Sequence, residues 1–292
     1  MDIIVVAQIV VSGALMGLVY ALVAYGFQLT YATSKSINFG QGELVMLSAL
    51  FSLSLAGWGL PYWLMVIGGL GFGALLGLVV ERAAVRLALE QKSEGWVLLT
   101  IIMGLLFFSS AENIWGRDDH PFPTPISADP LHLFGIDVTP REISVAIGVF
   151  GVMGLVELFK RRTLLGKAVE AVAADRDVAE LMGISAKHAV MLSYATSGAV
   201  AALAGILVAP ITTVGPTMAS VLVLKAFSVA VVAGLDSGFG VAVVGLVLGA
   251  LENLTSLYIG SGWREAPGLV LLIAALALRP NGIFGKATIR KV

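Results

Sequence analysis

Long stretches without a charged residue are the feature that most limits how this chain can fold. No Asp, Glu, Lys or Arg occurs between Asp2 and Lys35, or from Leu44 to Val80. A helix of about 20 apolar residues crosses the roughly 30 Å hydrocarbon core of a bilayer. Of the 292 residues, 58% are hydrophobic and only 13% are charged, against roughly 25% charged in soluble domains. Lipid must therefore be the solvent for much of this chain.

The spacing of these stretches predicts an all-α fold, a polytopic bundle of transmembrane helices with about eight or nine hydrophobic segments. The bundle is expected to form a single domain over residues 1–292. A first span is expected near residues 8–31, and residues 44–80 are long enough for two spans separated at 57–61. The remaining apolar segments are 96–113, 142–159, 188–224 with a break near 210–216, 221–235, 241–258 and 267–278.

Lys and Arg residues are distributed unevenly between the connecting segments. They are concentrated in residues 81–95, in residues 160–188 and in the tail that begins at Arg279. Alternation of the spans puts these three regions on one side, and positive loops face the cytoplasm. The polar segment 116–140, rich in Pro and Asp, is then expected to be external, as is the N-terminus. We expect a multi-pass protein of the bacterial inner (cytoplasmic) membrane.

Most catalytic and binding chemistries have no support in the sequence. The chain has no cysteine and no GxxxxGK[ST] phosphate loop, and its three histidines lie outside the middle of the apolar spans. No basic stripe with interleaved aromatic residues is present, so nucleic acid is not an expected partner. The chain is therefore expected not to be an enzyme, and to bind no metal or cofactor of its own.

A transport function remains, in two classes. A secondary transporter that uses no ATP would need acidic relays at membrane depth. The candidates for that role are Glu43, Glu112, Glu157 and Glu252, most of them near the ends of expected spans. The other class is a permease subunit driven by ATPases on separate chains.

The polar segment 36–43 lies between two strongly apolar stretches. Gly40 and Gly42 would break a helix or permit a positive φ. Non-helical backbone at membrane depth offers N–H and C=O groups to a polar solute, and Asn38 and Gln41 add neutral donors and acceptors. The segment predicts a broken or re-entrant helix, although an ordinary cytoplasmic turn is an equally good interpretation.

A second polar segment, residues 160–188, has the pattern of a short helix pair. Gly166 is expected to begin an Ala-rich helix, Asp175 to cap a second helix, and Gly183 to end it. Val178, Leu181 and Met182 would form one apolar face. Such a pair suits docking into a groove on a partner, and an amphipathic loop lying on the membrane is the alternative.

Several motifs in register make the chain resemble the permease subunits of branched-chain amino acid ABC importers, the LivH family. The residues that carry the resemblance are Ile37-Asn38-Phe39-Gly40-Gln41-Gly42-Glu43-Leu44, Arg161-Arg162-Thr163 with Gly166-Lys167-Ala168, Ala179 with Leu181-Met182-Gly183-Ile184, Leu203 to Leu207, Lys225-Ala226-Phe227, Val232 to Ser237, Gly245 and Gly249 with Glu252-Asn253, and Leu278 to Gly285. The chain departs from the family pattern at Gln41, where His is usual, at Gly40, where Ala is usual, and at Asp236, where Gly is usual.

The resemblance implies a division of labour between subunits. This chain would pair with a homologous permease of the LivM type, two cytoplasmic ATPases that use ATP, and an extracytoplasmic solute-binding protein. The substrate path would include Asn38, Phe39, Gly40, Gln41, Gly42 and Glu43. The ATPases would couple through Arg162, Gly166, Lys167, Asp175, Glu180, Leu181 and Gly183. The implied solute is a branched-chain amino acid or a similar small polar molecule, with urea, short amides and small carboxylates as alternatives.

Overall fold

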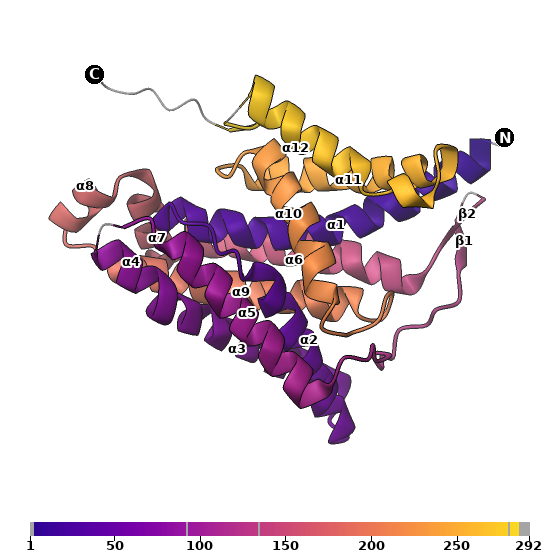
Figure 1. Cartoon of the computed structure of the whole chain (residues 1–292), viewed down its shortest axis with the longest axis horizontal. Helices are drawn as coiled ribbons and strands as arrows, with labels where there is room; N and C mark the ends of the chain where they lie inside the picture. Colours follow the sequence, from indigo (N-terminus) through magenta and orange to yellow (C-terminus); the bar gives the residue numbers. More distant parts are fainter. Residues whose placement is uncertain (1–2, 92, 134, 280, 286–292) are drawn as a thin grey trace.

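The computed structural model describes residues 3–91, 93–133, 135–279 and 281–285 (Figure 1). Within these ranges, seven helices are long and apolar enough to cross a membrane. They are α1 (Ile3–Ser34), α3 (Tyr62–Val80) with its continuation to Glu90, α5 (Trp96–Trp115), α6 (Pro140–Arg162), α9 (Ala186–Val208), α11 (Gly238–Tyr258), and the helical segment Ser261–Leu278, which contains α12 (Ala266–Leu278). Two shorter apolar helices, α2 (Gln41–Gly57) and α10 (Met218–Ala233), complete the bundle. The predicted all-helical fold and the number of hydrophobic segments are confirmed.

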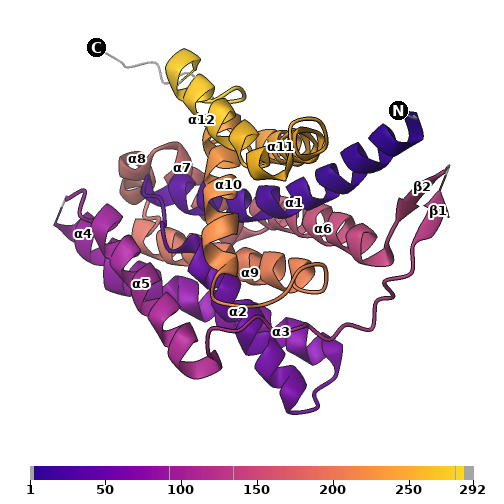
Figure 2. The same cartoon turned by 45° about the vertical axis from the view of Figure 1, so that its right-hand side comes forward.

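The helices are arranged around α9. It packs against α1, α2 and α3, and 61% of its most apolar stretch is buried. In α6 and α12 the corresponding figures are only 11% and 6%, so these two helices lie on the outside of the bundle. Figures 1 and 2 show α10 crossing α1 steeply, with α11 and α12 on the same side of α1 as the upper part of α10.

Paired glycines allow two sets of helices to approach very closely. On α1 and α11, a Cβ atom at Gly17 would lie 2.1 Å from the carbonyl oxygen of Gly245. On α3 and α9, a Cβ at Gly77 would lie 2.1 Å from the carbonyl oxygen of Tyr194. These contacts are backbone against backbone, which is how small residues stabilise helix pairs in lipid.

The two short helices are too short to cross the hydrocarbon core fully. At 1.5 Å per residue, the 17 residues of α2 and the 16 residues of α10 each span about 25 Å, less than the roughly 30 Å core. The last carbonyl groups of α10 are capped from a distant part of the chain, because Ile283 N donates to Val232 O and Phe284 N to Ala233 O. Gly234 follows with φ +95°, in the left-handed region that favours glycine.

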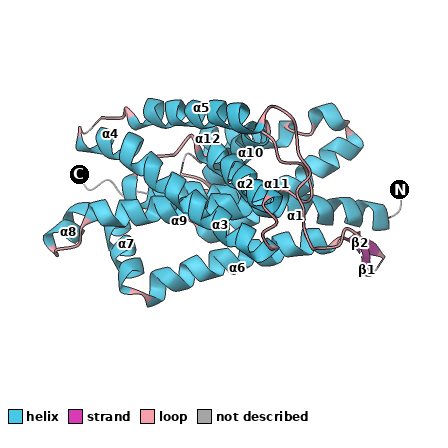
Figure 3. Cartoon of the chain, turned by 90° about the horizontal axis from the view of Figure 1, so that it is seen from below, coloured by secondary structure: helices cyan, strands magenta, loops and turns pink. Residues whose placement is uncertain are grey.

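The connections differ at the two ends of the molecule. At one end a hairpin forms from β1 (Leu131–Leu133) and β2 (Ile136–Val138), and Asp137 N donates to Gln8 Oε1 at the start of α1. At the other end project α7 (Leu164–Ala174) and α8 (Arg176–Leu181) (Figure 3). A π turn (Glu81–Val85) extends α3 into α4 (Arg86–Glu90), and a 3-10 turn (Ser261–Trp263) precedes α12.

Several predicted boundaries and details need correction. The first helix runs over 32 residues rather than 8–31, and the hairpin in segment 116–140 was not anticipated. Gly40 and Gly42 do not have positive φ. Gly166 lies inside α7 rather than at its start, because Thr163 caps the helix by accepting from Gly166 N. The predicted basic tail after residue 285, and Pro280 before it, lie outside the described residues.

Candidate functional site

The turn that follows α1 is buried among the helices. Residues 35–40 are non-helical, and α2 begins at Gln41. The predicted broken helix is therefore present over residues 36–40, while residues 41–43 form the first turn of α2. Lys35 has φ +54°, a conformation that non-glycine residues adopt rarely, and Ser36 is hydrogen-bonded to Tyr194 on α9 at 2.9 Å. The turn is thus tied directly to the central helix.

Asn38 and Gln41 form a buried polar network that links three helices. Asn38 Nδ2 donates to Gln41 Oε1 at 3.2 Å, and Asn38 Oδ1 accepts from Gly40 N at 3.1 Å. Gln41 Nε2 donates to Ser197 Oγ at 3.1 Å, and Ser197 Oγ donates to Gly26 O of α1 at 2.8 Å. Ser197 lies near the middle of α9, so Gln41 lies deep within the bundle rather than at its end.

Phe39 and Glu43 occupy the half-exposed side of the same segment. The ring of Phe39 stacks on Trp96 with centroids 6.5 Å apart, and it also contacts Phe227. Glu43 packs against Gly104 of α5, and among the described residues its buried Oε2 has no hydrogen-bond partner. Gly42 is required by close packing, because a Cβ there would lie 2.7 Å from the carbonyl oxygen of Ala219 on α10.

The segment predicted for coupling is a corner formed by two short helices, with an exposed apolar tip. Gly166 is buried, and a Cβ there would lie 2.3 Å from the carbonyl oxygen of Phe159 at the end of α6. Asp175 caps α8 by accepting from the N–H groups of Asp177 and Val178, and Gly183 ends it with φ +83°. The Asp175 cap and the end of α8 at Gly183 agree with the sequence-based expectation.

The side chains at the tip of this corner are turned outward. Leu181 and Met182 are 87% and 77% exposed, and Val178 is 54% exposed. Arg162, Lys167 and Glu180 are also exposed, Glu180 forming an ion pair with Arg176. Beneath them, Val169, Val172 and Ala179 pack on Ala186 and Ala189 of α9. The corner is therefore packed directly on the first turn of the central helix α9.

A third cluster was missed as a unit in the sequence. Lys225 Nζ on α10 lies 2.9 Å from Glu252 Oε2 on α11, and Tyr20 on α1 donates to the same oxygen at 3.1 Å. All three side chains are buried. A lone Lys within an otherwise apolar stretch was the available signal, because ionisable residues at membrane depth are rare and usually functional.

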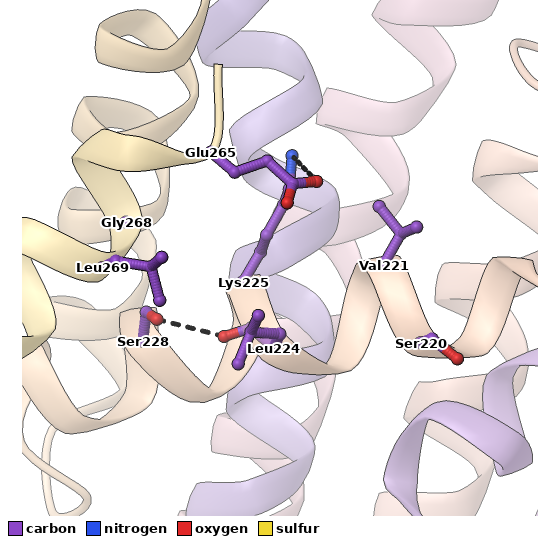
Figure 4. A pocket seen from close by; sticks show the side chains of 8 residues that line it. All are labelled: Ser220, Val221, Leu224, Lys225, Ser228, Glu265, Gly268 and Leu269. Atoms are coloured by element: carbon purple, nitrogen blue, oxygen red, sulfur yellow. Dashed lines mark hydrogen bonds and ion pairs between the residues drawn. The ribbon is translucent and has the colours of Figure 1, made fainter. Parts of the chain in front are cut away.

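Two cavities adjoin this ion pair. One, of about 250 Å³, is lined by Tyr20, Lys225, Arg264 and Asp119 together with apolar side chains of α1 and α10. The other, of about 160 Å³, lies between α10 and α12, where Glu265 Oε1 is 4.0 Å from Lys225 Nζ (Figure 4). A polytopic helix bundle with a broken helix, a buried ion pair beside cavities and a projecting helix corner defines a membrane transport subunit.

Comparisons with known proteins identify the family of that subunit. The family model for the permease component of the branched-chain amino acid transport system matches residues 9–277. The chain is 28% identical to the high-affinity branched-chain amino acid transport system permease protein LivH of Salmonella typhimurium, over 96% of each chain. It is 27% identical to the corresponding protein BraD of Pseudomonas aeruginosa, over 98% of this chain and 97% of that one. A solved structure, PsaBC from Streptococcus pneumoniae in complex with Fab, has a TM-score of 0.49 and 12% identity over 94% of this chain and 92% of its own.

The chain belongs to the family of branched-chain amino acid transport system permease components. It is a multi-pass protein of the inner membrane and the permease component of an ABC transport system, not its ATPase. Membership of this family favours the permease subunit over the secondary transporter, the two classes that the sequence left open. Glu252, a candidate relay for a secondary transporter, is paired with Lys225, and Glu112 and Glu157 are paired with Arg117 and Arg161.

Proposed function

We propose that the chain is one of two homologous permeases in an ATP-driven importer of branched-chain amino acids or similar small polar solutes. Its partners would be a permease of the LivM type, two cytoplasmic ATPases and an extracytoplasmic solute-binding protein. Residues 160–188 would face the cytoplasm, and residues 116–140 would face the solute-binding protein. The names of the relatives support the class of solute. The asymmetry of positive charge supports the orientation of the loops.

The exposed tip of α7 and α8 is the observation that carries the proposal. Val178, Leu181 and Met182 are large apolar side chains on a short, well-capped element outside the apolar bundle. An ATPase groove would bury them, and Arg162, Lys167, Asp175 and Glu180 would supply polar contacts at its rim. Gly166 and Gly183 would set the direction of the corner.

The central helix α9 offers a route from this docking surface to the substrate path. It is packed on α7 and α8 at its first turn, and it holds Ser36 through Tyr194 and Gln41 through Ser197. A shift of the corner on ATP binding would therefore bias the turn at residues 36–43. Phe39 and Glu43 would meet the solute from this turn, Gly40 and Gly42 would permit its close packing, and Asn38 and Gln41 remain predicted contributors to the path.

Affinity purification of the tagged chain in mild detergent, followed by mass spectrometry, tests this assembly. We expect an ATPase with a phosphate-binding loop and a second permease to co-purify. Leu181→Asp should release the ATPase while retaining the second permease, because it places a charge in the apolar contact. Ile259→Asp, which alters a 67% exposed apolar side chain in the connection after α11, outside the α7–α8 corner, is the control for a general effect of charge. Recovery of the native chain alone would contradict the proposal.

A further inference from the structure

Lys225 has hydrogen-bonding capacity that the ion pair does not use. An ammonium group has three N–H donors. One reaches Glu252 Oε2 at 2.9 Å, the Tyr20 hydroxyl is at the limit of 3.5 Å, and Glu265 at 4.0 Å is beyond hydrogen-bond distance. Glu252 Oε1 is buried and has no donor among the described residues. Such an incomplete buried network is costly unless a further group completes it.

The larger cavity brings Lys225 together with the groups that recognise an amino acid. Lys225 and Arg264 are cationic, Asp119 is anionic, and Met16, Val208 and Leu222 provide an apolar wall. At about 250 Å³, just below the usual range for drug-sized ligands, the cavity suits a small molecule.

The position of the cavity suits entry from the end of the molecule that carries the hairpin. Thr212, Thr213 and Thr217, in the connection that precedes α10, line it. Lys225 lies about two helical turns, or about 10 Å, further along α10. A solute entering past the threonines would thus meet the ammonium group at the inner limit of the cavity.

We propose that this cavity is a binding site for an α-amino acid, with Lys225 as the group that receives its carboxylate. Arg264 provides a second positive charge, Asp119 balances the α-ammonium group, and the apolar wall takes the side chain. Tyr20 and Glu252 position Lys225. The choice of solute rests on the proposed function. The site lies on α1, α10, the end of α9 and the connections that carry Asp119 and Arg264, apart from the turn at residues 36–43.

The absence of cysteine from the chain permits a direct test of occupancy. Thr213 is exposed at the cavity, so Thr213→Cys gives the full-length protein a single thiol there. We expect L-leucine to slow its reaction with a thiol reagent several-fold, and leucinol, which has no carboxylate, to leave it unchanged. Ser261→Cys, exposed at the same end of the molecule, is the control thiol that leucine should not protect. Equal protection by leucine and leucinol, or no protection, would overturn the proposal.

A pair of variants tests whether Lys225 binds the carboxylate of the solute or only forms a structural ion pair with Glu252. Lys225→Met leaves Glu252 buried without its counter-charge and is expected to lower the yield of folded protein, whereas Lys225→Met with Glu252→Met removes both charges and should restore it. In the double variant, carrying Thr213→Cys, leucine should no longer protect the thiol. Retained protection would show that the ion pair is only structural.

Uptake by the complete importer distinguishes failure of the proposed Lys225 site from failure of the proposed importer function. ATPase-dependent leucine uptake by the native chain that is undiminished in the folded double variant would overturn the Lys225 site and leave the proposed function standing. Failure of the native chain to support any ATPase-dependent leucine uptake would overturn the proposed function, and the choice of an amino acid for the cavity with it. Loss of uptake in the double variant alone is the expected result.

Discussion

Single residues without a side chain determine how closely the helices of this protein pack. Gly17 and Gly245 bring the backbones of α1 and α11 together, and Gly77 does the same for α3 against α9. The sequence does not predict these pairs, because the spacing of glycines within one helix carries no information on which helix it meets. The structure supplies the pairing.

At Gly17 we expect substitution to be costly. Gly17→Leu would force α1 and α11 apart, because even its Cβ would lie 2.1 Å from the carbonyl oxygen of Gly245. Overpacking of this kind costs about 1–3 kcal/mol or more, and the thermal unfolding temperature of the purified protein should fall. Gly71→Leu, on the exposed side of α3 with no atom within 4 Å of its Cβ, is the matched control. Similar losses in both variants would contradict the packing argument.

Gln41 makes a second prediction at this scale. Gln41→Leu keeps the volume of the side chain but leaves Asn38 Nδ2 without its acceptor and removes the contact with Ser197. A buried donor left without a partner costs about 1–3 kcal/mol, so thermal stability should fall. Asn113→Leu changes an exposed amide on α5 and should have little effect. An unchanged thermal stability of Gln41→Leu would contradict the stabilising role of this network.

At the scale of elements, the sequence predicted the helices well and their connections less well. Apolar stretches with few charges predicted about eight or nine hydrophobic segments, because the requirement for apolar side chains over the bilayer thickness is local. The Asp175 cap and the Gly183 stop were also predictable, since both act within one helical turn. The attachment of the β1–β2 hairpin to Gln8 and the capping of α10 by Ile283 and Phe284 depend on contacts between distant segments, which no local pattern reports.

Gly183 allows the role of the α7–α8 corner to be tested at this scale. Gly183→Val places a β-branched residue at φ +83° and should disturb the end of α8, although nothing lies within 4 Å of the new Cβ. We expect transport to be impaired while the solute-binding protein still captures its solute. Gly183→Asn is the control, because Asn tolerates this conformation. Normal transport by Gly183→Val would contradict the coupling role.

At the scale of the whole molecule, the candidate site joins residues that are far apart in the sequence. Lys225 and Glu252 each belong to a motif that resembles the LivH family, but only the fold shows that they form an ion pair with Tyr20. Likewise, the segment at residues 36–43 was recognised from its polarity, whereas its attachment to the middle of α9 required the structure. Sequence therefore predicted candidate residues, and tertiary packing determines which of them act together.

The energy source of transport tests the central claim most directly. The chain would be reconstituted in liposomes with its second permease, ATPases and solute-binding protein, and L-leucine uptake would be measured with native ATPases and with ATPases that bind but do not hydrolyse ATP. We predict that uptake requires ATP and occurs only with the native ATPases. This uptake should be unaffected when proton and sodium gradients are collapsed. Uptake that persists with the inactive ATPases and follows an imposed proton or sodium gradient would contradict an ATP-driven permease.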